Sequence, residues 1–360
     1  KAGKYNLAVM NIETRDTPEA VSPATNFTVA RVKRDLLRRS GIGLFASNRS
    51  VSSTGIGSNQ AVGVDGTFSF FQNVNFGGYW AKTWNEGVTR DSDSYQGRFD
   101  YLHDRYGVRF DYLKVGDNFN PEVGLVRRDN FRRTWGSLRF SPRPRRSKLV
   151  RKYTWEASLE YLVNGQDILE TRTQNGRFNI EFQNSDRFSV GVVDDYELLL
   201  RPFSVIPSAR IAPGGYRFTT GRIGYNLGQQ RRYSGNVLYE QGDFYDGQRK
   251  TITLSRSRIN LSSQLSVEPS VSLNWIDLPT QSFTNNLVGS RVTFTATPLL
   301  FASALIQYNA TTHVVSTNAR LRWEYRPGSE LFVVFNENRD RSAVGTVPAL
   351  QDRSFIVKVN

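Results

Sequence analysis

The sequence predicts an all-β protein, a transmembrane antiparallel up-and-down β-barrel of about 20 strands with short periplasmic turns and longer extracellular loops. Two observations carry this prediction. Apolar and polar residues alternate with period two along nearly the whole chain, and short and long connections alternate between these stretches. Tyr153, Trp155 and Leu159, for example, alternate with Thr154 and Glu156. Such a stretch forms a strand with one apolar and one polar face.

The same period recurs from the first residues to the last, whereas helical three-four spacing is hard to find. An even number of strands is typical of a bacterial barrel that closes with both ends on one side. In order, the expected strands span residues 4–14, 26–36, 40–49, 60–71, 74–84, 93–102, 105–114, 131–140, 151–163, 168–182, 187–199, 216–227, 232–241, 247–256, 263–275, 285–297, 299–309, 315–326, 329–338 and 352–360.

The connections alternate in length, as they do in outer-membrane barrels. The short links are expected to be the periplasmic turns, which means that the first strand rises from the periplasm. The tight turn at 164–165 is an exception, because the alternation predicts a long loop there. The short links are 72–73, 103–104, 184–186, 297–298 and 326–329, and the longer polar segments are 15–25, 49–59, 85–92, 115–130, 201–215 and 338–351.

A soluble β-sandwich or β-propeller is the alternative, because period-two strands also build those folds. Three features argue against it. The expected strands commonly have ten or more residues, whereas strands of soluble proteins usually have about five or six. No blade-length repeat is apparent. Aromatic residues lie at strand ends, as in the interfacial girdles of membrane barrels. These aromatic residues are Trp80, Trp84, Tyr153, Tyr161, Tyr239, Trp275, Trp323 and Tyr325.

Composition narrows the classes of function. The chain has 360 residues, no cysteine, two histidines and a net charge of +14. Without cysteine there is no disulfide framework and almost no soft ligand for zinc or copper, so we expect no cofactor. The positive charge suits a nucleic-acid binder, a membrane-surface protein or a channel with a basic lumen. No stretch approaches the roughly 20 apolar residues of a transmembrane helix.

Charged residues occupy the polar parity of many strands and are therefore expected to face the lumen of the barrel. They could form a selectivity surface for solutes, or they could pair across neighbouring strands and hold a water-filled barrel together. The expected lumen-facing residues are Arg98, Asp100, Arg109, Asp111, Glu156, Glu160, Glu181, Asp195, Glu268, Arg320, Arg322 and Glu324.

The densest basic cluster contains Arg143, Arg145, Arg146 and Lys148, broken by Pro144, at an expected periplasmic turn. It lacks the interleaved aromatic residues of a nucleic-acid site, so we expect no nucleic-acid partner. A solvated turn, or contact with anionic lipid or another envelope protein, is the favoured interpretation.

Two further features could carry chemistry. The loop with Asp117, Asn118, Asn120 and Glu122 could bind calcium or a sugar through its oxygens, or it could simply be a polar surface loop. His103 and His313 have no sequence-adjacent partner at a catalytic spacing, so no catalytic residue is assigned and an enzyme is the less favoured class.

The run Arg320–Asn336 resembles the closing hairpin of a family of bacterial outer-membrane β-barrel domains of unknown function. In that family the barrel follows an N-terminal domain similar to a family 9 carbohydrate-binding module. Residues 26–32 and 39–43 resemble its early strands, and 121–128 resemble its central loop. The resemblance implies that residues 1–360 form one outer-membrane barrel domain, part of a longer chain that carries the carbohydrate-binding-like domain.

The expected function is a pore or binding and uptake barrel for glycans or other polar solutes in the bacterial outer membrane, with lipid as partner. The glycan comes only from the resemblance. The alternative is a non-conducting barrel that anchors a soluble domain or joins an envelope complex. About twenty strands enclose a lumen too wide for side chains to fill, so water, loops or a plug from another polypeptide must occupy it. A surface hydrolase is the third possibility.

Overall fold

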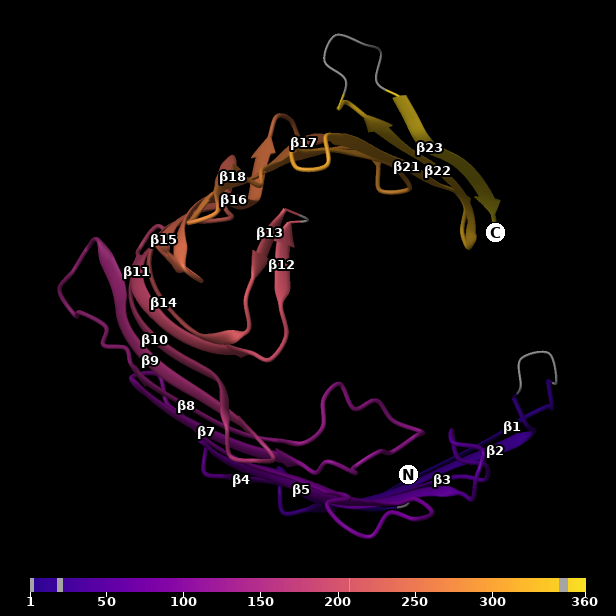
Figure 1. Ribbon diagram of the computed structural model, residues 1–360. Helices are drawn as coiled ribbons and strands as arrows, with labels where there is room; N and C mark the ends of the chain where they lie inside the picture. Colours follow the sequence, from indigo (N-terminus) through magenta and orange to yellow (C-terminus); the bar gives the residue numbers. More distant parts are fainter. Residues whose placement is uncertain (1–2, 18–21, 207, 343–348) are drawn as a thin grey trace. The chain divides into compact units, whose positions relative to one another are not determined.

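The computed structural model describes residues 3–17, 22–206, 208–342 and 349–360. Within these residues the protein is all-β, as predicted, with 23 strands and no helix. Twenty-one strands form one antiparallel up-and-down sheet, and β12 (Phe203–Ile206) and β13 (Ala209–Ile211) form a separate hairpin (Figure 1). No helix that could cross a membrane occurs in this described part of the chain.

The chain divides into two compact units. The first comprises residues 1–141, 156–175 and 195–199. Within it each of the first eight strands pairs antiparallel with the next strand in the chain. These strands, drawn from indigo to magenta in Figure 1, are β1 (Tyr5–Thr14), β2 (Thr25–Leu36), β3 (Ser40–Arg49), β4 (Asn59–Phe70), β5 (Val74–Trp84), β6 (Asp93–Leu102), β7 (Tyr106–Val115) and β8 (Phe131–Phe140).

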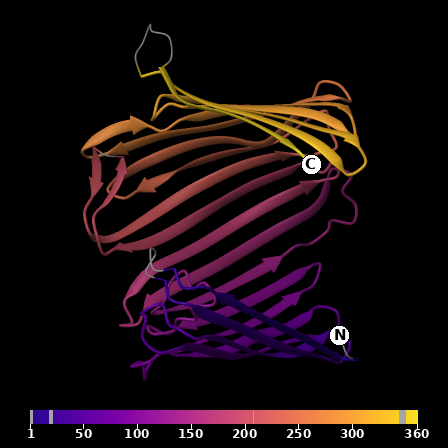
Figure 2. The same cartoon turned by 90° about the vertical axis from the view of Figure 1, so that its right-hand side faces the viewer.

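The second unit comprises residues 142–155, 176–194 and 200–360, and its strands again pair in chain order (Figure 2). They are β14 (Gly214–Leu227), β15 (Tyr233–Phe244), β16 (Gly247–Asn260), β17 (Leu265–Leu278), β18 (Gln281–Thr284), β19 (Leu287–Thr297), β20 (Leu300–Asn309), β21 (Val314–Arg326), β22 (Ser329–Asp340) and β23 (Ala349–Val359). The remaining strands contribute residues to both units and are β9 (Val150–Asn164), β10 (Leu169–Phe182) and β11 (Arg187–Leu199).

All twenty expected strands are present, and their ends agree with the sequence prediction to within about four residues. The prediction missed β12 and β13, which lie inside the expected loop 201–215, and β18, which pairs with the end of β17. Each of these strands has three or four residues, which is too short for a period-two pattern to be recognised. The expected tight turn at 164–165 is also present, between β9 and β10.

Each unit exposes its apolar face more than its polar one. In the first unit, residues opposite one another on neighbouring strands share a face, and Leu44, Val64 and Trp80 follow one another across β3, β4 and β5. Trp80 is 43% exposed, whereas Asp111 on the opposite face is only 7% exposed. In the second unit Ile223 and Trp323 are likewise exposed. This distribution is the reverse of that in a protein whose apolar side chains pack in a core.

Candidate functional site

Four of the expected lumen-facing residues meet on the polar face of the first unit. The register places Arg98 opposite Asp111 and Asp100 opposite Arg109 on β6 and β7. Arg98 Nε lies 2.8 Å from an Asp100 oxygen, and Arg109 Nε lies 3.9 Å from the other. Asp111 is held by Arg133 of β8 at 2.8 Å. Arg98 and Asp100 pair within β6, whereas the Arg109–Asp100 and Arg133–Asp111 contacts join neighbouring strands.

The other expected lumen-facing residues lie elsewhere along the strands and do not join this cluster. Glu181 pairs with Arg151 at 3.1 Å, and Arg322 pairs with Glu330. Glu324 accepts a 3.3 Å hydrogen bond from the Gly328 N–H. Among the remaining residues, Glu156 and Glu160 are half-buried and Arg320 is exposed. Asp195 accepts a hydrogen bond from Thr173, and Glu268 lies 3.9 Å from Arg258.

One ion pair joins strands that are not neighbours. Arg31 of β2 donates to both carboxylate oxygens of Asp65 on β4, at 2.9 and 2.8 Å, over the intervening strand β3. Gly43 of β3 lies beneath this pair. A Cβ atom there would come within 2.6 Å of an Asp65 oxygen and 3.1 Å of the Arg31 guanidinium. A side chain at this position would force the carboxylate and the guanidinium to shift, so glycine allows the pair to form directly over β3.

The connection between β7 and β8, residues 116–130, lies against the polar face of the first unit. Asn59, which is 0% exposed, fixes it at the start of β4. Its amide nitrogen donates to the Asn120 carbonyl at 2.8 Å and also to Asn85, and its oxygen accepts from the Glu122 N–H at 3.1 Å. Thr83 adds a second anchor by accepting from the Asn120 N–H at 3.2 Å. The segment is thus a loop with exposed polar side chains whose backbone is tied to two strands.

Glu122 provides a third anchor of the same loop, and its side chain is only 4% exposed. The carboxylate accepts hydrogen bonds from the hydroxyls of Ser52 and Ser53 and from the Ser53 N–H, each at 2.7 Å. Arg49 lies 3.1 Å away. Burial alone would raise the pKa of Glu122, but the hydrogen bonds from Ser52 and Ser53 and the Arg49 charge outweigh it and lower the pKa below its ordinary value. The ionised carboxylate therefore holds the loop at neutral pH.

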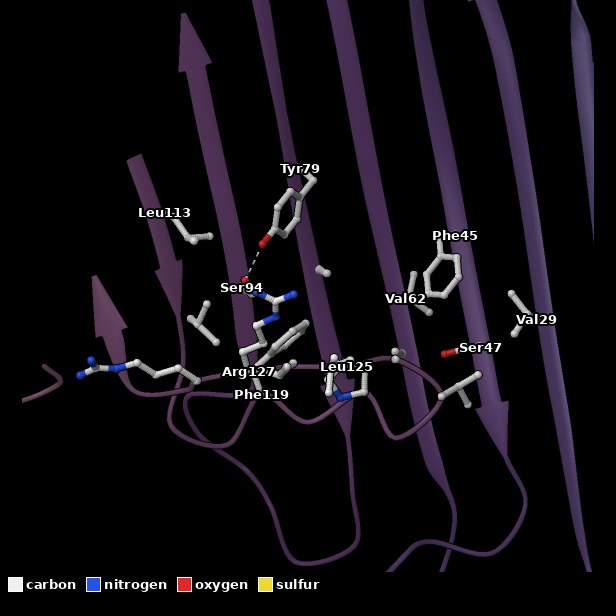
Figure 3. A pocket seen from close by; sticks show the side chains of 18 of the residues that line it. Val29, Phe45, Ser47, Val62, Tyr79, Ser94, Leu113, Phe119, Leu125 and Arg127 are labelled. Carbon is white, nitrogen blue, oxygen red and sulfur yellow. Dashed lines mark hydrogen bonds between the residues drawn. The ribbon is translucent and has the colours of Figure 1, made fainter. Parts of the chain in front are cut away.

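A pocket of about 650 Å³ lies between this loop and the strands (Figure 3). Its floor comes from β1 to β8 and its roof from residues 119–128. In Figure 3, Phe119, Leu125 and Arg127 of the loop lie opposite Phe45 and Tyr79 of the strands. The volume is that of a typical small-molecule site, and the lining is mostly apolar with a few polar groups. An apolar lining is unusual on a face that carries ion pairs elsewhere.

Sequence reasoning singled out Asn120 and Glu122 of the loop but missed the strand residues that anchor it and the residues that line its pocket. Asn59 and Ser47 gave no signal, because an isolated polar residue near a strand end is common. The turn at Pro121–Gly124, closed by a 2.7 Å hydrogen bond between the Gly124 N–H and the Pro121 carbonyl, was the one local signal available. Nothing in the residues 116–130 themselves says whether the loop extends away from the strands or folds onto them.

The basic turn connects β8 and β9, and its four cationic side chains are exposed: Arg143, Arg145, Arg146 and Lys148. His103 accepts a 3.4 Å hydrogen bond from the Arg105 N–H, and His313 occupies a turn with φ of 54°. No group of three or more His, Asp or Glu side chains among the described residues could hold a metal ion. Asp117 and Asn118 are exposed at the loop end.

Comparison with models of protein families finds no match, and no curated protein matches the chain. The resemblance to barrel domains that follow a carbohydrate-binding-like module stays a prediction.

Proposed function

We propose that this chain is a bacterial outer-membrane β-barrel that lets polar solutes pass along its polar face. The observation that carries the proposal is that the apolar face of the sheet is more exposed than its polar face. Leu44, Val64 and Trp80 offer a broad apolar surface, while Asp100 and Asp111 are shielded on the opposite face. An exposed apolar face is costly in water and favourable against lipid hydrocarbon, and a polar face suits a water-filled lumen.

The loop 116–130 would narrow the lumen in this proposal. It is anchored at Asn59, Thr83 and Glu122, so it would be a fixed constriction at neutral pH and not a freely moving segment. Ion pairs such as Arg98–Asp100 would present alternating charges to a passing solute. The choice of glycans as the solute class rests on the resemblance described above. Charged side chains of the polar face, such as Arg98 and Asp100, can form hydrogen bonds with the hydroxyl groups of a glycan.

The test is single-channel conductance of the purified chain in a planar bilayer, with and without added oligosaccharide. We expect stable conductance steps that oligosaccharide blocks. Glu122→Gln should raise the conductance or its noise, because the loop loses the ionised carboxylate that holds it. The control is Ser69→Ala, which removes a polar side chain at the end of β4 opposite Asn59 and should leave the conductance unchanged. A folded, heat-modifiable chain that inserts but never conducts would overturn the pore.

A further inference from the structure

The pocket under the 116–130 loop differs in chemistry from the face on which it lies. Met10, Val29 and Phe45 line it from the first three strands, and Phe119 and Leu125 cover it from the loop. A pore for polar solutes has no need of an apolar pocket on its polar face. The anchors of the loop at Asn59 and Glu122 preform the cavity, because they hold its roof in place without any contact from a ligand.

Polar groups are found at two ends of this apolar space. At one end the Tyr79 and Ser94 hydroxyls lie 3.0 Å apart, and Figure 3 shows Arg127 directed from the loop toward them. Arg128 beside it is held by Glu170, whereas Arg127 has no carboxylate partner among the described residues. Arg127 is exposed, so its guanidinium is available to an anion.

At the other end lies Ser47 of β3. The residue is 6% exposed, and its hydroxyl oxygen is buried with no hydrogen-bond partner in the described part of the chain. Figure 3 draws this oxygen at the edge of the pocket. A buried hydroxyl without a partner is costly and is usually paired with a protein group, water or ligand. This unpaired oxygen is therefore a second, independent indication that something polar occupies that end.

The two ends are three strand steps apart. Ser47 pairs with Ala61 on β4, and Ser94 of β6 pairs with Ala81 on β5. Neighbouring strands lie about 4.8 Å apart, so the distance from β3 to β6 is roughly 14 Å. A ligand that reaches both ends must therefore be extended and narrow, with an apolar middle.

We propose that this pocket binds a single-chain anionic amphiphile. Its acidic head pairs with Arg127 beside Tyr79 and Ser94, and its acyl chain lies between Phe45, Phe119 and Leu125. A hydroxyl at the far end of the chain pairs with Ser47. The inference goes beyond the proposed pore and does not depend on it, because binding can be measured whether or not the barrel conducts.

The experiment uses the full chain in phosphatidylcholine nanodiscs, with empty nanodiscs subtracted, and isothermal titration with dodecanoate. We expect saturable binding that weakens about fourfold for each methylene removed, as in decanoate and octanoate. Dodecyltrimethylammonium, with the same chain and a cationic head, should not bind. ω-Hydroxydodecanoate should bind about fivefold more tightly than dodecanoate through one net hydrogen bond to Ser47.

Three variants separate the contacts. Arg127→Gln should weaken dodecanoate binding by about 10- to 100-fold, the value of a charge-assisted hydrogen bond, and Arg127→Lys should keep most of it. Ser47→Ala should remove only the preference for the hydroxylated chain. Ala81→Phe should fill the cavity and abolish binding, and Arg145→Gln, a change of equal charge in the turn between β8 and β9, which does not line the pocket, should have no effect. Gel mobility checks that each variant is folded.

Partition into the lipid is separated from binding by photolabelling. Dodecanoate with a diazirine at its chain end should label the peptide that contains Ser47. Labels only on exposed apolar residues such as Val64, or binding that Arg127→Gln and Ala81→Phe both leave unchanged, would overturn the proposal. Displacement of dodecanoate by a lysophosphatidylglycerol, which has one acyl chain, would identify a lysophospholipid as the source of the chain, and the absence of displacement would identify a free acid. Either result supports the site.

Discussion

Asn59→Ala should release the 116–130 loop from the polar face while leaving the strands in place. The side chain is completely buried and satisfies both the Asn120 carbonyl at 2.8 Å and the Glu122 N–H at 3.1 Å. Each buried group that loses its partner costs about 1–3 kcal/mol. Two such groups amount to roughly 2–6 kcal/mol of local stability, or about a 30- to 25,000-fold increase in the population of the open loop.

Hydrogen–deuterium exchange of the peptide that spans 116–130 measures this opening directly, because exchange from a locally opened segment reports its free energy. Asn236→Ala is the matched control. That asparagine lies on β15 and donates a hydrogen bond of 3.5 Å to Ser255, so its loss should leave exchange in the loop unchanged. Exchange in the loop that is the same in the Asn59→Ala variant and the parent chain would show that the buried amide does not hold the loop.

Three further predictions concern the loop, a turn and the apolar face. Because the folded pKa of Glu122 is depressed, its contribution is complete above the ordinary glutamate pKa of 4.5 and is lost as pH falls through the folded value. The protection of the loop amides relative to their intrinsic exchange rate should be constant from neutral pH to 4.5 and fall below it; a loss of protection already at neutral pH would refute this. Asp186→Asn should cost roughly 2–4 kcal/mol in urea unfolding, because the 2% exposed carboxylate accepts from Tyr225 at 3.0 Å and faces Arg231 at 2.9 Å. An unchanged midpoint would contradict that. Val64→Lys should cost about 2–4 kcal/mol in lipid vesicles if the apolar face meets hydrocarbon, but less than about 0.5 kcal/mol if it meets water.

The strands could be predicted because their signal is local. A strand such as β9 repeats its period over many residues, and every second side chain from Tyr153 to Tyr161 reports the same face. Arg98, Asp100, Arg109 and Asp111 were placed on one face by the same parity, whereas the register that sets Arg98 opposite Asp111 and Asp100 opposite Arg109 is seen only in the structure. Alternation alone fixed which charges share a face.

The pocket could not be predicted, because it depends on contacts between residues far apart in the chain. Asn59 meets Asn120 and Glu122 across more than sixty residues, and no period relates these positions. The direction in which a loop folds depends on such contacts, which a single sequence does not display. The apolar lining was misleading for the same reason, since Val29 and Phe45 lie on the polar parity of their strands.

The ion pair between Arg31 and Asp65 makes Gly43 a mechanical feature of the sheet. Backbone hydrogen bonds tie each strand only to its immediate neighbours, so a sheet held by them alone can be peeled one strand at a time. The contact over Gly43 ties β2 directly to β4, so that detaching β2 requires breaking a bond to its second neighbour as well. A strand without a side chain at one position thus lets two others fasten across it, and this part of the sheet should resist fraying from its first strands.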